Sequence, residues 1–168
     1  MSEHQNHDSV VFLLDMAGTS MLFTGDMDAA AEQDLLYMIL DGSLAAQFEQ
    51  KGADFGVTEG VVQRVLTRPL QVNSNGAPAA ASISIDVLKV AHHGSKTSST
   101  EAWLQYWNAK TAVISAGVNN TYGHPNPGVM ERLEATGSEI YRTDQMGEVQ
   151  MKVKDGKIDI RYKLVGME

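Results

Sequence analysis

The sequence predicts a layered α/β fold in a single domain. Apolar runs of strand length alternate along the chain with amphipathic segments that have helical periodicity. The 168 residues are 43% hydrophobic, which is enough for one core and too little for two full domains. Charged residues make up 20% of the chain, so the composition does not favour gross disorder.

The first expected elements are a strand hairpin and a helix. Residues 9–15 are a continuous apolar run, an Ala-Gly pair gives a turn, and residues 20–23 form the return strand. Asp28 is expected to cap a helix that covers about residues 28–40, because aspartate accepts hydrogen bonds from the first free backbone amides.

Residues 41–82 differ from their surroundings in composition. They are rich in Gly, Ala, Ser and Asn, and they end in the run NSNGAPAAAS. This composition predicts a flexible surface insertion rather than a second domain. A single domain over residues 1–168 is therefore expected, with the insertion at about 41–82.

Strands and helices alternate again after the insertion. One helix is expected to begin at Ser98, which has capping-box spacing to Glu101. The next begins at Asn126 with Pro127 in its first turn, and Gly137 ends it. The remaining strands are expected at 83–90, 111–116 and 138–142, followed by a hairpin of 147–153 and 157–163.

The composition excludes several classes of protein. The absence of cysteine rules out a disulfide scaffold, a cysteine zinc finger, an iron–sulfur cluster and a thiol nucleophile. The net charge of −8 disfavours a stand-alone nucleic-acid clamp, although a bound metal would supply local positive charge. No apolar run reaches about 18 residues and the first residues do not resemble a signal peptide, so no membrane span or targeting signal is expected.

Polar motifs follow the ends of three expected strands. Asp26, the pair His92-His93, and His124 each lie just after a strand. In layered α/β proteins such loops bring distant residues together at one edge of the sheet. A carboxylate with two or three imidazoles suits zinc or manganese, so the pattern indicates a divalent-metal site.

Each of these residues also has an ordinary structural interpretation. Asp26 is then a helix-entry carboxylate beside the helix dipole. His92 and His93 are a loop pair, with one ring buried and hydrogen-bonded and the other in water. His124 is a turn residue restricted by Pro125. The coincidence of three strand-end positions weakens these ordinary interpretations, and both they and the metal site remain open at this point.

Longer motifs in the same loops resemble one known family. They are S-V-V-F-L-L with M-L-F-T-G-D, D-V-L-K-V-A-H-H-G-S-K-T-S-S, A-V-I-S-A-G-V-N-N-T-Y-G-H-P and Y-R-T-D-Q-M-G. Together they resemble the metallo-β-lactamase-fold domain of the ComEC family of competence DNA-uptake proteins. The resemblance covers about residues 9–40 and 83–150.

This resemblance implies an αββα sandwich with a metal site at the shared edge of two similar halves. By the likeness, Asp26 bridges the metals, and one of His92 and His93 is a ligand, with His93 preferred. His124 lies at the rim as a ligand, proton donor or phosphate contact. The implied activity is that of a metal-dependent phosphodiesterase or nuclease acting on DNA, within a bacterial membrane-associated protein.

Substrate contacts are expected beside these ligands. A serine-rich loop before the second helix would hold a phosphate at the helix start, or would serve only as a helix cap. The predicted substrate-binding residues are Ser95, Lys96, Thr97, Ser98, Asn120 and Tyr122.

The sequence departs from the family in one respect. The family's first half carries an H-x-H-x-D-H motif that supplies most ligands and a catalytic acid, and this sequence has no such motif. The chain therefore resembles the C-terminal half of the domain, and in isolation it is expected to be inactive or weakly active. Expected partners are DNA, the missing N-terminal half or the membrane channel portion, and a second copy in a homodimer. The alternatives are a non-catalytic remnant or partner-binding domain, and a phosphoesterase or lactonase of the same fold.

Overall fold

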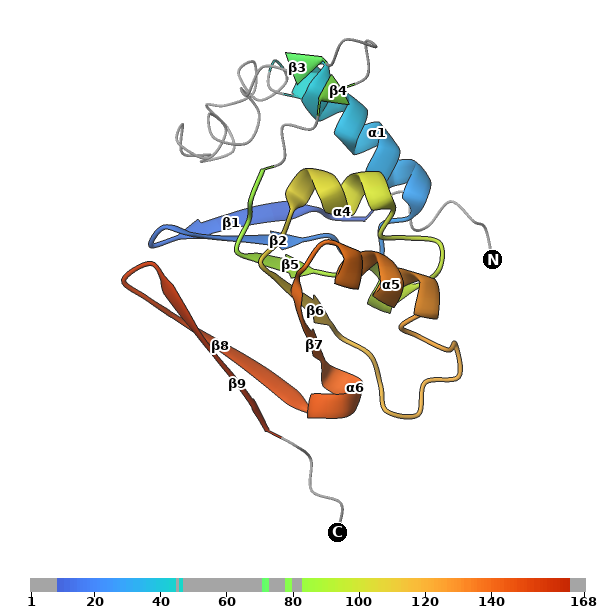
Figure 1. Cartoon of the computed structure of the whole chain (residues 1–168), viewed down its shortest axis with the longest axis vertical. Helices are drawn as coiled ribbons and strands as arrows, with labels where there is room; N and C mark the ends of the chain where they lie inside the picture. The colour runs from blue at the N-terminus through green and yellow to red at the C-terminus, as the bar shows by residue number, and fades with distance from the viewer. Residues whose placement is uncertain (1–8, 45, 47–70, 73–77, 80–82, 164–168) are drawn as a thin grey trace.

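A computed structural model describes residues 9–44, 46, 71–72, 78–79 and 83–163 (Figure 1). Most of the predicted insertion at 41–82 lies outside these residues, so the proposed insertion stays a prediction. Within the described part of the chain, no helix is both long enough and apolar enough to cross a membrane.

A mixed five-stranded sheet forms the centre of the structure, with the strand order β1-β2-β5-β6-β7. The first pair is an antiparallel hairpin, and the remaining neighbours pair in parallel. This arrangement confirms the predicted layered α/β fold. The strands are β1 (Phe12–Met16), β2 (Thr19–Phe23), β5 (Val87–Lys89), β6 (Thr111–Ile114) and β7 (Glu139–Arg142).

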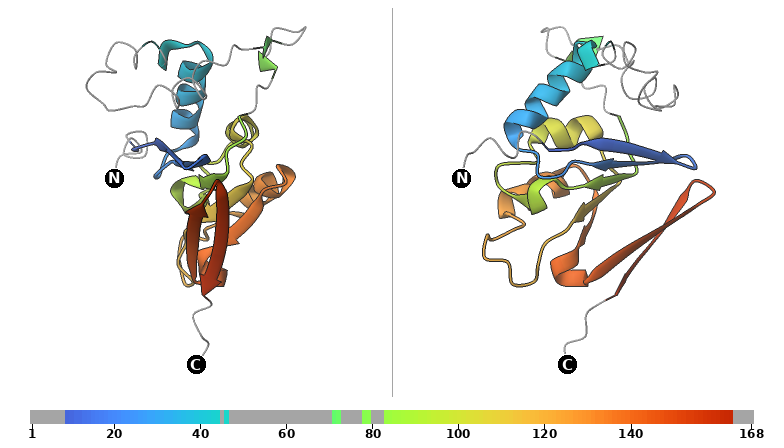
Figure 2. Two further views of the ribbon diagram at one scale, coloured as in Figure 1. Left: turned by 90° about the vertical axis from the view of Figure 1, so that its left-hand side faces the viewer. Right: turned by 180° about the vertical axis from the view of Figure 1, so that it is seen from behind.

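Helices cover one face of this sheet (Figures 1 and 2). Apolar side chains from three helices and from alternate strand residues form one buried cluster, in which Trp103, Leu88 and Leu133 are almost inaccessible to solvent. The three helices are α1 (Ala29–Leu40), α4 (Glu101–Trp107) and α5 (Pro127–Ala135), and the short helices are η1 (Ala91–Gly94) and α6 (Thr143–Met146).

The opposite face of the sheet is only partly covered. Phe12, Leu14 and Met16 of β1 point to this side and are 51%, 39% and 45% exposed. A separate hairpin of β8 (Glu148–Lys154) and β9 (Lys157–Lys163) approaches from the β7 side. Its tip lies against the β1–β2 turn (Figure 1). Tyr162 of β9 approaches Tyr141 of β7 with ring centroids 6.5 Å apart. Another two-stranded sheet pairs β3 (Gln71–Val72) with β4 (Pro78–Ala79).

Short-range sequence signals correctly predicted the start of two helices and the position of one turn. Asp28 accepts a hydrogen bond from the Ala31 amide at the start of α1, and Asn126 caps α5 through the Gly128 amide. The turn between β8 and β9 lies at Asp155-Gly156, where both residues have positive φ. These caps and this turn are confirmed.

Two expected boundaries are wrong. The strand expected at 83–90 is only Val87–Lys89, because the Ile83 and Ile85 amides bond to the last carbonyls of α4 instead of to another strand. Ser98 does not cap α4, because its hydroxyl donates to the Ala91 and Ser95 carbonyls. Thr100 is the cap, and it accepts from the Trp103 amide.

Candidate functional site

The carboxyl ends of β2, β5 and β6 bring the predicted polar residues together. These strands are parallel neighbours, so the loops that follow them emerge at one edge of the sheet. Asp26 Oδ1 lies 3.7 Å from His93 Nε2. The ring centroid of His92 lies 6.4 Å from that of His93 and 5.8 Å from that of His124. The convergence expected from the sequence is therefore observed, while the roles of these residues stay predictions.

His93 is oriented by a backbone carbonyl. Its Nδ1 lies 2.6 Å from the Ser115 oxygen, which only accepts hydrogen bonds, so Nδ1 carries the proton. In the neutral form of the ring the lone pair is then on Nε2, which lies 3.7 Å from Asp26 Oδ1. A metal-ligating histidine commonly has this arrangement, because the second hydrogen bond fixes the tautomer and the ring plane.

The spacing of Asp26 and His93 fits a shared ion. Two ligands at about 2.1 Å from a tetrahedral zinc lie roughly 3.4 Å apart. The observed 3.7 Å between Asp26 Oδ1 and His93 Nε2 is close to this separation. Within the described residues, however, no group of three or more acidic, histidine or cysteine side chains is arranged to hold a metal.

The histidine loop has an uncommon backbone. His92 and His93 have φ of 46° and 56°, and Gly94 follows at 80°. A left-handed conformation costs a non-glycine residue about 1 to 3 kcal/mol and persists where the surrounding structure holds it. Here the His92 amide donates to the Gly25 carbonyl, and the Asn126 amide donates to the Gly94 carbonyl. Strain held in this way is found mostly at functional sites.

His124 lies on a loop that Asn120 organises. The Asn120 amide group donates to the Gly117 and His124 carbonyls, and its oxygen accepts from the His124 amide. The Nδ1 atom of His124 is buried and has no hydrogen-bond partner. Burial lowers the pKa of His124, and the nearby His92 and His93 lower it further. The neutral ring is therefore favoured, with a nitrogen available to a ligand.

Comparison with known proteins identifies the family of this chain. The metallo-beta-lactamase superfamily matches residues 1–118. The chain belongs to this superfamily. It is 30% identical over 151 residues to ComE operon protein 3 of Bacillus subtilis (strain 168), which is 90% of this chain and 14% of that protein. It is also 39% identical over 77 residues to Recombination protein 2 of Haemophilus influenzae (strain ATCC 51907 / DSM 11121 / KW20 / Rd), which is 46% of this chain and 10% of that protein.

A third relative is Competence protein ComA of Neisseria gonorrhoeae, with 39% identity over 72 residues, or 43% of this chain and 10% of that protein. No solved structure matches the chain. The sequence-based assignment to the metallo-β-lactamase domain of competence proteins is confirmed. The chain spans only 10% to 14% of the length of these relatives.

The predicted phosphate loop of this superfamily member lies before α4 rather than at its start. Ser95 Oγ and Thr97 Oγ1 are 3.0 Å apart and bond to each other, and Ser98 is buried and bonded to backbone carbonyls. Lys96 and Thr97 are exposed beside them. Since α4 begins at Glu101, these side chains do not line its first turn.

A buried brace that was not predicted holds this loop. Glu32 of α1 is fully buried, and its carboxylate accepts from the Ser99 and Thr100 amides. Arg132 of α5 donates to the carbonyls of Ser98 and Ser99. The brace therefore joins the three segments that follow Asp26, His93 and His124. Its signal in the sequence is a single glutamate within the apolar face of a helix.

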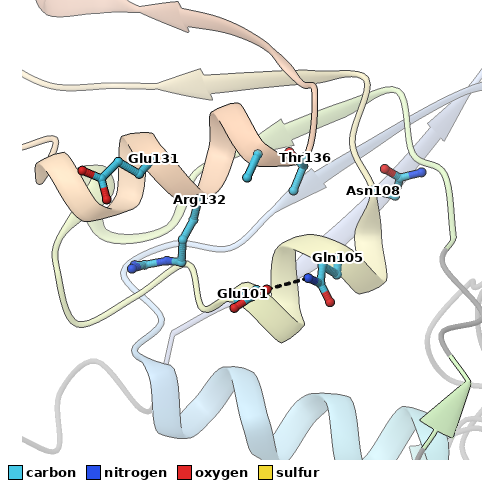
Figure 3. A pocket seen from close by; sticks show the side chains of 7 residues that line it. Glu101, Gln105, Asn108, Glu131, Arg132 and Thr136 are labelled. Carbon is cyan, nitrogen blue, oxygen red and sulfur yellow. Dashed lines mark hydrogen bonds between the residues drawn. The ribbon is translucent and has the colours of Figure 1, made fainter.

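Arg132 also lines a groove between α4 and α5, shown in Figure 3. Glu101 and Gln105 bond to each other across one wall of this groove. None of the predicted site residues lines it. The groove is therefore separate from the histidine edge.

Lys89 is a second residue that sequence reasoning missed. It ends β5 on the partly open face, and its Nζ donates to the Val90 carbonyl at 2.8 Å. Burial lowers the pKa of Lys89, while the negative charge of Asp26 acts in the opposite direction. Buried Thr24 donates to the Lys89 carbonyl at 2.8 Å and so ties the loop before Asp26 to β5. The lysine inside the run D-V-L-K-V-A-H-H is the signal that marks it.

Proposed function

We propose that this chain is part of a metal-dependent phosphodiesterase that acts on DNA during DNA uptake. The observation that carries the proposal is the pairing of Asp26 with a His93 ring whose Nδ1 is fixed by the Ser115 carbonyl. Membership of the metallo-beta-lactamase superfamily supports metal-dependent chemistry. The likeness to a protein named for competence supports a role in DNA uptake.

In this proposal Asp26 and His93 hold a divalent ion, zinc or manganese, with His92 beside them. The bound ion supplies an activated water and stabilises charge that develops on the phosphoryl oxygens. His124 has a lowered pKa, so its neutral ring suits ligand binding or hydrogen-bond acceptance better than proton donation at neutral pH. Lys89 balances the charge of Asp26.

We further propose that the remaining ligands come from a segment carrying the H-x-H-x-D-H motif. A catalytic zinc needs about three protein ligands and an open position, and Asp26 with His93 supplies two. The relatives are much longer than this chain, which supports a whole protein with further domains, including a membrane-associated part.

A partner-binding domain without catalysis is the second candidate. It is favoured by the lack of a three-ligand group among the described residues and by the exposed apolar side chains of β1. Such a face is a typical docking surface for another domain. In this case substitution of Asp26 would not change DNA cleavage, whether the chain is assayed alone or together with other domains.

DNA cleavage tests the proposal. The chain is assayed on single- and double-stranded DNA with manganese or zinc, alone and mixed with a separately expressed segment that carries H-x-H-x-D-H. Background cleavage by the chain alone and clear cleavage by the mixture are expected, and Asp26→Ala is expected to abolish the latter. Cleavage by the mixture that survives Asp26→Ala would contradict the proposed function. Robust cleavage by the chain alone that Asp26→Ala removes would contradict the need for further ligands.

A further inference from the structure

An exposed aromatic side chain lies at the rim of the candidate site. Tyr122 is 82% exposed, the highest value among the exposed large apolar side chains of the described residues. Its ring stacks on His124, with centroids 5.9 Å apart and planes inclined by 21°. One face of the phenol is thus supported by the site, while most of its surface is open to solvent.

The backbone that carries Tyr122 is held in place. Three hydrogen bonds of Asn120 close the turn on either side of it, from Gly117 to His124. The ring is therefore presented in a fixed position rather than on a loose loop. A ring that is positioned before binding loses little conformational entropy when a ligand stacks on it.

A continuous series of side chains leads from this ring to the candidate metal ligands. Tyr122 contacts His124, the His124 ring lies 5.8 Å from His92, and His92 neighbours His93, which faces Asp26. A planar group stacked on Tyr122 would consequently lie a few ring widths from Asp26. A strand held by one base on Tyr122 would therefore run along these side chains and bring one of its phosphates to Asp26.

We propose that Tyr122 is a stacking platform for an unpaired nucleobase, so that the site takes single-stranded rather than double-stranded DNA. The inference rests on the proposed function and names its substrate class. Both faces of a base inside a duplex are covered by its neighbours, whereas an unstacked base offers a face to an aromatic ring. Stacking also needs no cluster of cations, which agrees with a chain of net charge −8.

Binding of short labelled oligonucleotides tests the platform without requiring turnover. Fluorescence anisotropy is measured for oligothymidylate and for an oligonucleotide of the same length and charge that lacks bases. Tyr122→Ala is expected to weaken oligothymidylate binding by about 5- to 100-fold, the usual effect of losing one stacked base. Tyr122→Phe keeps the ring and should retain the affinity. Tyr37→Ala removes another tyrosine, 70% exposed on α1, and should have no effect.

A second readout reports contact with the ring directly. In Tyr122→Trp the new indole is expected to be quenched by oligothymidylate and not by the oligonucleotide without bases, since Trp103 and Trp107 are buried. Equal affinity of wild type and Tyr122→Ala, or equal binding of both oligonucleotides, would overturn the platform and leave the proposed function standing. Failure of the wild type to bind either oligonucleotide would also overturn the platform, while cleavage by the mixture with the H-x-H-x-D-H segment decides the proposed function separately.

Discussion

Gly94→Ala is expected to lower the free energy of unfolding by about 2 to 5 kcal/mol and to displace the loop that carries His124. A Cβ at position 94 would lie 2.7 Å from the Pro125 Cβ and 3.1 Å from the Pro125 Cα. The second of these is a backbone atom, so the overlap is not relieved by a side-chain rotation. Gly94 also has φ of 80°, which adds backbone strain for alanine. Urea denaturation followed by circular dichroism measures the loss.

Substitutions at two other glycines distinguish the cost of steric overlap from the cost of backbone strain. Gly123 has φ of 70°, but no atom lies within 4 Å of the place that a Cβ would take, so Gly123→Ala should cost only the backbone strain, about 1 to 2 kcal/mol. Gly117 has neither a left-handed φ nor a close neighbour, and Gly117→Ala should be near neutral. If Gly94→Ala were no worse than Gly123→Ala, the close packing of Gly94 on Pro125 would not hold in solution.

Glu32→Ala is expected to destabilise the chain by about 2 to 5 kcal/mol. Its removal leaves the buried Ser99 amide and the part-buried Thr100 amide without their acceptor, and it takes away the negative charge that interacts with Arg132. Gln33→Ala on the exposed side of the same helix is the control and should change stability by less than about 0.5 kcal/mol. Denaturant midpoints of the two variants, compared with wild type, check the prediction. Equal midpoints for Glu32→Ala and Gln33→Ala would exclude the brace.

The pH dependence of stability, compared between wild type and Glu32→Gln, is an independent test of the burial of this carboxyl. Burial raises the pKa of Glu32, and the bonds from Thr100 and Ser99 and the charge of Arg132 only partly oppose this. When the pKa of a carboxyl is higher in the folded state than in the unfolded state, the group stabilises the fold most at a pH below its unfolded-state pKa. This stabilisation is lost as the pH rises through the folded-state pKa. The stability of wild type relative to Glu32→Gln should therefore decrease from about pH 4.5 upward. A relative stability that increases over this range would contradict the burial of the carboxylate.

The sequence predicted those features that depend on neighbours in the chain. The caps at Asp28 and Asn126 and the turn at Asp155-Gly156 each rest on contacts within three residues. The meeting of Asp26 with His93 was also predictable, because strand ends in a parallel sheet share one edge. Local chemistry and the rule for parallel strands were sufficient for both.

Features set by distant partners were not predictable. The Glu32 carboxylate accepts a hydrogen bond from the Ser99 amide, 67 residues away in the chain, and no short-range pattern predicts that pairing. Ile83 and Ile85 have the apolar pattern of a strand, yet the end of α4 takes their amides. The Ser115 carbonyl that fixes His93 is a backbone group, which no side-chain motif can mark. In each case tertiary hydrogen bonding decided the outcome.

Metal titration of the whole chain, followed by NMR of the histidine rings, tests the central claim that Asp26 and His93 share one divalent ion. Zinc is expected to shift the His93 Nε2 resonance while the Nδ1 proton bonded to Ser115 remains. The affinity should fall by at least about tenfold in Asp26→Ala and in His93→Ala, and stay unchanged in Asp159→Asn on β9. Zinc binding of equal strength in wild type, Asp26→Ala and His93→Ala, or a His93 ring that zinc does not perturb, would contradict the account.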